Sequence, residues 1–270
     1  MFTLQDVEIL VSTMYRDSLV FLEGMFPGGS FSDYNILVIN QTDAERELVS
    51  SYPNVKVVNS AERGLSNSRN QALQHALGKL CVIADDDVVF RKDFAQKIVN
   101  AYNEQPHTAL MVFRAEDGNG KAYKNYPVAK HHSLSQLQRL SVMSIEMVVN
   151  LPLVKQAGVE FDRRFGLGST FTMGEEAVFV NALHKKGLTI LAEPEFIVQH
   201  PAEDTHKRVS VSEKYYVQGA LFTALFGTAW LTWTFIKIAF EIKNKKLSLS
   251  QVAVALKAAY KGRKALLRYE

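Results

Sequence analysis

Three adjacent carboxylates, Asp85-Asp86-Asp87, directly follow the apolar run Leu80–Ala84. Adjacent acids repel one another, so this triplet needs a cation to offset its charge. Mg²⁺ and Mn²⁺ choose carboxylate oxygens and bridge them to phosphates. Because open α/β sheets bind ligands beyond the carboxyl ends of their strands, the triplet predicts a site for a divalent cation and a phosphate group. A solvated acidic turn before a helix is the alternative.

A second polar group precedes the triplet by one helix, in the stretch RGLSNSRN at residues 63–70. Gly64 permits a tight turn, Ser66 suits the N-cap of a helix, and Arg69 adds a positive charge. A helix N-terminus beside an arginine favours an anion. An ordinary capped helix with Arg69 in a surface ion pair is the alternative.

The elements that must position these residues alternate between strands and helices. Apolar runs predict strands, and periodic apolar residues with cap residues predict helices. This alternation is typical of a mainly parallel sheet covered by helices on both faces. The predicted strands are residues 7–13, 34–40, 55–58, 80–84 and 108–113, and the predicted helices among them are 66–77 and 91–103.

The pattern continues after a long interruption. Residues 117–134 are polar and predict a long loop, which in compact domains is often a substrate lid. We place a domain boundary near residue 210, so that residues 1–210 form an α/β domain and residues 211–270 a helical C-terminal region. Between the loop and the boundary, the sequence predicts strands at 141–149, 189–192 and 195–199 and helices at 151–157 and 174–186.

The composition indicates one large domain with a small appendage, because the chain has 270 residues and is 47% hydrophobic. Cys81 is the single cysteine, and the N-terminus has no secretory pattern, so we expect a reducing, cytoplasmic compartment. The net charge of +3 combines +7 over residues 237–270 with −4 over the rest. This asymmetry argues against a general nucleic-acid binder and predicts that the C-terminal region meets an anionic surface.

The C-terminal region contains an uncharged stretch, Tyr215–Ile236, that is long enough to span a bilayer. A crossing would place the basic tail on the far side of the membrane, against the tendency of Lys and Arg to stay inside. The final helix, opened by Ser248 or Ser250, has leucines along one face and lysines along another, as interfacial helices on anionic lipid have. We therefore expect peripheral attachment to the inner face of a membrane. Two ordinary packed helices are the alternative.

Several motifs together, in their order and spacing, resemble the family 2 inverting nucleotide-sugar glycosyltransferases, which have the GT-A fold. The resemblance covers roughly residues 5–205. It implies a Rossmann-like sheet flanked by helices, with a helical appendage here at the C-terminus. It rests on a strand ending in Ser12-Thr13, on RGLSNSRN at 63–70, on Gly78 before the Asp triplet, on FDRRFGLG at 161–168 and on GEEAVF at 174–179.

The resemblance also implies roles for individual residues. Glu176 stands at the position of the catalytic base, and Glu175 where an acceptor hydroxyl binds. Asp87, the last acid of the Asp-x-Asp motif, and His200 would hold Mg²⁺ or Mn²⁺. The positions that would meet the nucleotide are Thr13, Tyr15, Asn40, Gln41, Arg63, Asn67, Arg69, Asp85 and Asp86. Structural alternatives are helix-start acids facing the dipole, for the glutamates, and a hydrogen-bonded strand-end histidine.

The chain departs from the family pattern at two positions. Asn40-Gln41 stands where many members have an acidic residue, which leaves the nucleobase open. The usual base is Asp, whereas this chain has Glu, so the base stays open between Glu176, which we favour, and Glu175. Gln136-x-x-Arg139-Leu140 is similar to the Gln-x-x-Arg-Trp signature of processive synthases, but it lacks the Trp and precedes Glu175. We therefore expect one sugar per encounter.

The predicted function is metal-dependent transfer of a sugar, with inversion, from a nucleotide sugar to a hydroxyl of a glycan or lipid-linked acceptor, in surface polysaccharide synthesis. A sugar-phosphate nucleotidyltransferase is one alternative, but its Gly-x-Gly-Thr-Arg loop would stand where this chain has STMYR at 12–16. A non-catalytic sugar-binding or membrane-binding protein on the same fold is the other.

Overall fold

The computed structural model describes residues 1–200 and 209–269, and the chain divides into two compact units. The sheet unit consists of Met1–Arg163 and Glu175–Ala202, and the helical unit of Arg164–Gly174 and Glu203–Glu270. The C-terminal helices fall in the helical unit, whose second segment begins at Glu203, before the boundary predicted near residue 210. The helical unit also includes Arg164–Gly174, which the sequence had placed in the first domain.

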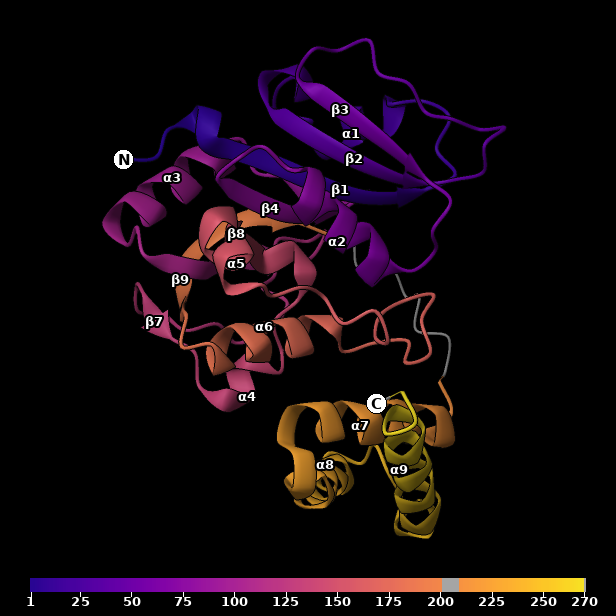
Figure 1. The fold of residues 1–270 in the computed structure, drawn as a ribbon. Coiled ribbons are helices and arrows are strands. Elements are labelled where there is room, and N and C mark those ends of the chain that lie inside the picture. Colours follow the sequence, from indigo (N-terminus) through magenta and orange to yellow (C-terminus); the bar gives the residue numbers. More distant parts are fainter. Residues whose placement is uncertain (201–208, 270) are drawn as a thin grey trace. The chain divides into compact units, whose positions relative to one another are not determined.

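The sheet unit is built on a nine-stranded mixed sheet with helices on both faces (Figure 1). Eight strands follow the order β3-β2-β1-β4-β8-β6-β9-β5, and β7 pairs with β9. The strands are β1 (Val7–Met14), β2 (Asn35–Gln41), β3 (Val55–Ser60), β4 (Leu80–Asp85), β5 (Val89–Phe90), β6 (Thr108–Glu116), β7 (His132–Ser133), β8 (Met147–Asn150) and β9 (Thr189–Gln199).

The parallel character that the sequence predicts holds for β3, β2, β1 and β4. In contrast, β8 runs antiparallel to both β4 and β6, so the sheet is mixed, while β6 and β9 pair in parallel as the first four strands do. The α/β class itself is confirmed.

Helices cover the sheet because its strands carry apolar side chains on both faces. Ile9 and Val11 point to the core beside α3, and Leu10 points to the core beside α2, α5 and α6. The helices of this unit are α1 (Val20–Met25), α2 (Leu65–His75), α3 (Phe94–Glu104), α4 (Gln136–Arg139), α5 (Leu151–Ala157) and α6 (Glu175–Lys185).

Two predicted elements have different bounds in the structure. The strand expected at 141–149 is only the short β8, and a 3₁₀ turn over Ser144–Glu146 precedes it. The two strands expected at 189–192 and 195–199 form one strand, β9, whose pairing with β6 shifts register between Ala192 and Phe196. Pro194 lies in this interval and lacks a backbone N–H, so the shift removes it from the ladder.

The helical unit contains α7 (Val211–Phe226), α8 (Trp230–Lys243) and α9 (Val252–Leu266). The uncharged stretch Tyr215–Ile236 is divided, because Gly227 ends α7 at φ 55°. Among the described residues, Val211–Lys243 alone is long and apolar enough to cross a membrane by length and composition. That criterion is weak evidence, since a core helix of a soluble protein also meets it.

Close helix packing holds α7 against α9. A Cβ added to Gly219 would lie 2.0 Å from the carbonyl oxygen of Ala259, and one added to Gly262 would lie 1.8 Å from that of Tyr216. Only glycine permits this approach of the two backbones. The face of α9 that carries Ala255, Ala258 and Ala259 is therefore buried against α7.

The segment Arg164–Gly174 contacts other parts of the helical unit. The ring of Phe171 lies 5.6 Å from that of Tyr216, and the Thr170 hydroxyl lies 2.6 Å from the Tyr269 hydroxyl. Gly174 ends the segment in the left-handed region at φ 101°, and the next residue opens α6. The backbone directly before Glu175 is thus held by the helical unit.

Candidate active site

The three acids of the triplet separate at the carboxyl end of β4, and each finds a different basic partner. Asp85 pairs with Arg69 at 3.3 Å, Asp86 with Arg16 at 2.7 Å, and Asp87 with the Nε2 atom of His200 at 3.2 Å. This division reduces the repulsion that the sequence implied.

Arg69 is buried, with only 1% of its surface exposed, and holds three carboxylates together. Its NH1 atom lies 3.1 Å from Glu175 and 3.1 Å from Glu176, while NH2 reaches Asp85. The guanidinium also stacks on Phe161, with 5.6 Å between them. Arg69 therefore acts as an internal counterion that joins the start of α6 to the end of β4, rather than as the surface ion pair considered for it.

The electrostatics of this group are unbalanced, because one buried cation faces three acids. Burial alone would lower the pKa of Arg69, but the carboxylates outweigh that effect and raise it. Burial raises the pKa of Asp85 and, together with the charge of Glu176, raises the pKa of Glu175. Glu175 is the more buried of the two glutamates, with 6% of its side chain exposed against 19% for Glu176.

His200 and Asp87 form the second part of the site. Tyr123 orients the histidine, because its hydroxyl donates to the His200 carbonyl oxygen at 3.0 Å and accepts from Nδ1 at 3.1 Å. Nε2 then faces Asp87, and the hydrogen bond from His200 lowers the pKa of Asp87. The Asp87 carboxylate and the Nε2 atom of His200 lie 3.2 Å apart, so a divalent cation could take the place of the hydrogen bond that joins them.

The protein ligands to such a cation would be few. No group of three or more His, Cys, Asp or Glu side chains that could hold a metal occurs among residues 1–200 and 209–269. A carboxylate and an imidazole suit Mg²⁺ or Mn²⁺ when phosphate oxygens and water complete the coordination. The donor set thus matches a cation that binds together with a diphosphate.

An exposed aromatic platform follows β1. Tyr15 adopts a left-handed backbone, at φ 55°, and leaves 45% of its surface exposed. The guanidinium of Arg63 lies 5.1 Å from the ring and that of Arg46 lies 5.9 Å from it. Strained backbone at a bulky residue occurs mainly where the surroundings enforce it, often at a ligand site. Arg63 is itself fixed by Asp43, at 2.6 Å.

Thr13 and Asn40 make hydrogen bonds that hold the turn after β1 in place. The Thr13 hydroxyl donates to Asp86, and Asn40 bonds both the N–H and the carbonyl oxygen of Arg16, at 3.1 and 3.0 Å. Asn40 is fully buried and also bonds Asn59, so its side chain has no surface for a nucleobase. Asn40 therefore shapes this turn, although the resemblance had implied a nucleotide contact.

Three buried acceptor oxygens of residues predicted for the site lack a protein hydrogen-bond partner among the described residues. They are Oε1 of Gln41, Oδ1 of Asn67 and Oε2 of Glu175. The amide nitrogen of Asn67 is used, since it donates to the Arg63 carbonyl oxygen at 2.7 Å. Buried acceptors are rarely left unpaired, so these atoms are suited to accept hydrogen bonds from a ligand.

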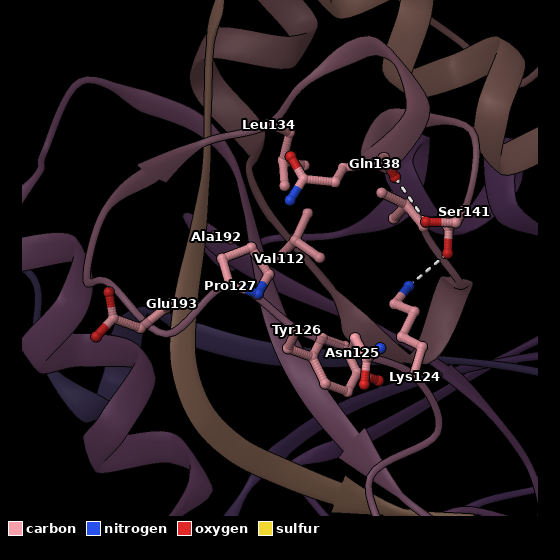
Figure 2. A pocket seen from close by; sticks show the side chains of 11 residues that line it. Val112, Lys124, Asn125, Tyr126, Pro127, Leu134, Gln138, Ser141, Ala192 and Glu193 are labelled. Atoms are coloured by element: carbon pink, nitrogen blue, oxygen red, sulfur yellow. Dashed lines mark hydrogen bonds between the residues drawn. The ribbon is translucent and has the colours of Figure 1, made fainter.

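The long loop predicted at 117–134 is anchored by a buried acid. Glu146 lies 2.6 Å from both the Lys124 ammonium and the Tyr126 hydroxyl. Figure 2 shows Lys124 directed at Ser141 beside a cavity between the loop and β9. The cavity measures about 30 Å³, which holds a water molecule but no sugar ring.

Three residues of the site were missed from the sequence. Arg16 follows the first strand directly, so its place at a carboxyl end could have identified it. Tyr123 lies in the polar loop, 77 positions from His200, and no local pattern signals that contact. Ser144, which approaches Asp85 at 3.4 Å, lies in a segment predicted as a strand.

Comparison with known proteins bears on both sequence and fold. Residues 28–149 match the sequence profile of Glycosyl transferase family 2, a region that includes Arg63, Arg69 and the Asp triplet but ends before Glu175. No curated protein sequence matches the chain.

The fold is similar to that of S. aureus TarS. The TarS 1-349 crystal structure matches at a TM-score of 0.61 and 14% identity, over 95% of this chain and 80% of that one. The same fragment in complex with UDP-GlcNAc matches at 0.60 and 14%, over 93% and 79% of the two chains. At this identity the similarity shows the fold alone. With the matched profile, it confirms the resemblance that the motifs indicated: this chain is similar to the family 2 glycosyltransferases of GT-A fold.

Proposed function

We propose that the chain transfers a sugar from a nucleotide-sugar donor to an acceptor hydroxyl in one displacement, with inversion at the anomeric carbon. The observation that carries this proposal is the Arg69 cluster, defined as Arg69, Asp85, Glu175 and Glu176. It links a strand end suited to the donor with a carboxylate suited to the acceptor. Polar groups held rigidly at two reacting centres are what a displacement requires.

Glu176 is the proposed base. Its side chain is more exposed than that of Glu175, so an acceptor hydroxyl can reach it. As the acceptor oxygen attacks the anomeric carbon, its proton passes to the Glu176 carboxylate and the bond to the diphosphate breaks. Glu175, with a free buried oxygen, accepts a second hydrogen bond from the acceptor and positions it.

The donor would lie across the carboxyl ends of β1, β2 and β4. Tyr15, with 45% of its surface exposed, offers ring surface for a nucleobase, and Gln41 and Asn67 offer acceptors for its N–H or ribose O–H groups. TarS was crystallised with UDP and with UDP-GlcNAc, which makes uridine diphosphate sugars the first donors to test.

Asp87 and His200 would hold Mg²⁺ or Mn²⁺. When bound, the cation would supply positive charge to the leaving diphosphate. Tyr123 keeps the His200 ring in place, and Arg16 and Thr13 fix Asp86 beside it. The resemblance directs Asp85 and Asp86 toward the ribose, and both side chains remain partly exposed, at 34% and 26%.

The cellular setting that fits this chemistry is the cytoplasmic side of a membrane, where nucleotide sugars and lipid-linked or growing glycan acceptors meet. Cys81 is reduced and buried, which suits that compartment. The basic C-terminal region provides the attachment to anionic lipid. We further propose that each encounter adds one sugar, in the synthesis of a surface polysaccharide.

The test is a panel of nucleotide sugars read by thermal unfolding, with Mn²⁺ and with chelator. A ligand that binds the native state alone raises the melting temperature. We expect one donor to raise it only when Mn²⁺ is present and the Asp87→Ala variant to lose that response. A panel in which no nucleotide sugar shifts the transition would contradict the proposal.

A further inference from the structure

The α8 helix carries an exposed apolar face. Its buried residues, Trp230, Thr234, Ile238 and Glu241, recur at helical spacing and pack into the helical unit. The opposite face has no charge from residue 231 to 240. Its large residues are half exposed, at 41% for Leu231, 49% for Phe235, 50% for Ile236 and 57% for Phe240.

The one charged residue within this length of α8 does not interrupt the face. Lys237 is only partly exposed and pairs with the buried Glu241 at 3.2 Å, on the inward side of the helix. Soluble proteins rarely leave four large apolar residues clustered on one helix face without a partner. Burial against water-excluding material would thus stabilise this face.

Basic residues border the apolar face. Lys243, Lys245 and Lys246 follow it directly and are exposed. Residues 209–269 contain ten Lys or Arg and only two Glu. Glu241 is buried and paired, so Glu213 is the single exposed acid of this part of the chain. The charge next to the face is therefore complementary to an anionic surface.

The other amphipathic helix is not available for the same purpose. The sequence had assigned the interfacial role to the final helix, through Leu249, Val252, Leu256, Ala259 and Leu266. In the structure, Ala259 and Leu266 are buried, and the small residues of α9 pack on α7. Leu249 stays 77% exposed, but it is the only one of the five that does, whereas α8 leaves four large apolar residues open.

We propose that this face of α8 docks on an anionic lipid bilayer, with Leu231, Phe235, Ile236 and Phe240 among the upper acyl chains and Lys243, Lys245 and Lys246 on the phosphate headgroups. The inference rests on the membrane attachment in the proposed function and identifies its surface. An apolar helix face with a basic border is the form in which helices lie in a membrane interface.

The native protein contains its own probe, because both tryptophans of the chain, Trp230 and Trp233, are in α8. Vesicles of phosphatidylcholine with phosphatidylglycerol are prepared with brominated acyl chains, which quench nearby tryptophan. We expect the full-length wild-type chain to bind these vesicles at low salt with quenched fluorescence, and to bind pure phosphatidylcholine at least about tenfold more weakly. Because Trp230 faces inward and Trp233 is only partly exposed, the decisive reporter is Phe235→Trp, whose added tryptophan should be quenched more strongly than the two native ones; an unquenched Phe235→Trp protein on the vesicles would overturn the assignment to α8.

Variants of the apolar face and of its basic border test the proposal independently of fluorescence. The double variant Phe235→Ser/Phe240→Ser should bind anionic vesicles at least about tenfold more weakly, and Lys243→Gln/Lys246→Gln should weaken binding and flatten its salt dependence. The matched control is Leu77→Ser/Val128→Ser, which removes two exposed apolar residues, at 83% and 85%, from the sheet unit. Its binding should equal that of the wild type.

Several outcomes would overturn the proposal. They are absence of wild-type binding to anionic vesicles, an unaffected Phe235→Ser/Phe240→Ser variant, and a dimer that this variant disrupts while vesicle binding stays unchanged. Release of nucleoside diphosphate from the donor in free solution should be the same in all these variants. That readout separates failure of the membrane face from failure of the proposed transfer reaction.

Discussion

Each unit buries a charged side chain, an arginine in the sheet unit and a glutamate in the helical unit, and the two differ in how far their partners satisfy them. In the sheet unit, Arg69 faces three acids, and the buried Glu175 keeps an unpartnered oxygen. In the helical unit, Glu241 is satisfied by Lys214 at 2.5 Å, by Lys237 and by the Tyr215 hydroxyl. We call the second group the Glu241 cluster.

The pKa values follow this difference. Burial alone would raise the pKa of Glu241, but hydrogen bonds from the lysines lower it, so the group is charged and paired. In the Arg69 cluster, burial and the charge of Glu176 raise the pKa of Glu175, and one cation faces three carboxylates. A buried acid whose hydrogen bonds are satisfied supports a fold, whereas a buried excess of negative charge is retained where chemistry needs it. The comparison therefore assigns structure to the helical unit and chemistry to the sheet unit.

The largest expected effect comes from Asp87→Ala. Asp87 is about half exposed and pairs with His200, so the melting temperature should change little. Sugar transfer should fall more than about a thousandfold, because a bound cation contributes several kcal/mol to the departure of a diphosphate. Initial rates with Mn²⁺ measure this effect. Full activity in the variant, or in the wild type with excess chelator, would show that the reaction does not need a metal.

The clusters themselves can be compared by removing the central charge of each. Arg69→Met leaves carboxylates unpaired in the interior, and we expect a loss of about 3–5 kcal/mol in the free energy of unfolding. Glu241→Gln leaves two lysines whose side chains are about a third exposed and can reach water, so about 1–3 kcal/mol should be lost.

Urea unfolding followed by circular dichroism measures both variants, and tryptophan fluorescence follows the helical unit separately because both tryptophans are in α8. Equal losses for Arg69→Met and Glu241→Gln would show that the two clusters do not differ as argued.

A smaller effect is expected in the pH dependence of stability. The pKa of Glu175 is raised to about 7 in the folded protein, from an ordinary value of 4.5. The folded state therefore binds the extra proton, and this stabilisation, complete below about pH 4.5, is lost as the pH rises through about 7. Between pH 5 and 8 the wild type should lose about 2–3 kcal/mol more than Glu175→Gln. Parallel pH profiles for the two proteins would contradict the raised pKa.

The smallest effect concerns Tyr123→Phe, which removes the hydroxyl that orients His200. We expect affinity for Mn²⁺ with nucleoside diphosphate to fall about tenfold, as for other residues that position a metal ligand, without a change in melting temperature. Isothermal titration gives this affinity. His200→Ala should weaken it at least as much, and a large drop in melting temperature with unchanged affinity would identify His200 as a core histidine instead.

The sequence predicted the α/β fold and the strand ends that carry polar residues. The spacing of apolar residues and the positions of glycines and cap residues are local signals, so a short stretch of sequence carries them. It also named the members of the Arg69 cluster, since Arg69, Asp85 and the two glutamates stand in short motifs. It did not predict that Arg69 faces inward, because that depends on residues 106 and 107 positions away. Burial of the α9 face and exposure of the α8 face were likewise set by helix packing at Gly219 and Gly262.

The most direct test of the central claim uses Glu176→Gln beside Glu175→Gln and the wild type. Release of nucleoside diphosphate is followed with a bound donor, Mn²⁺ and an acceptor, and donor affinity is measured on the same preparations. We expect unchanged donor affinity and at least about a hundredfold loss of turnover for Glu176→Gln, as when a general base is removed. An active Glu176→Gln variant beside an inactive Glu175→Gln variant would reverse the two roles, and full turnover in both would contradict the account.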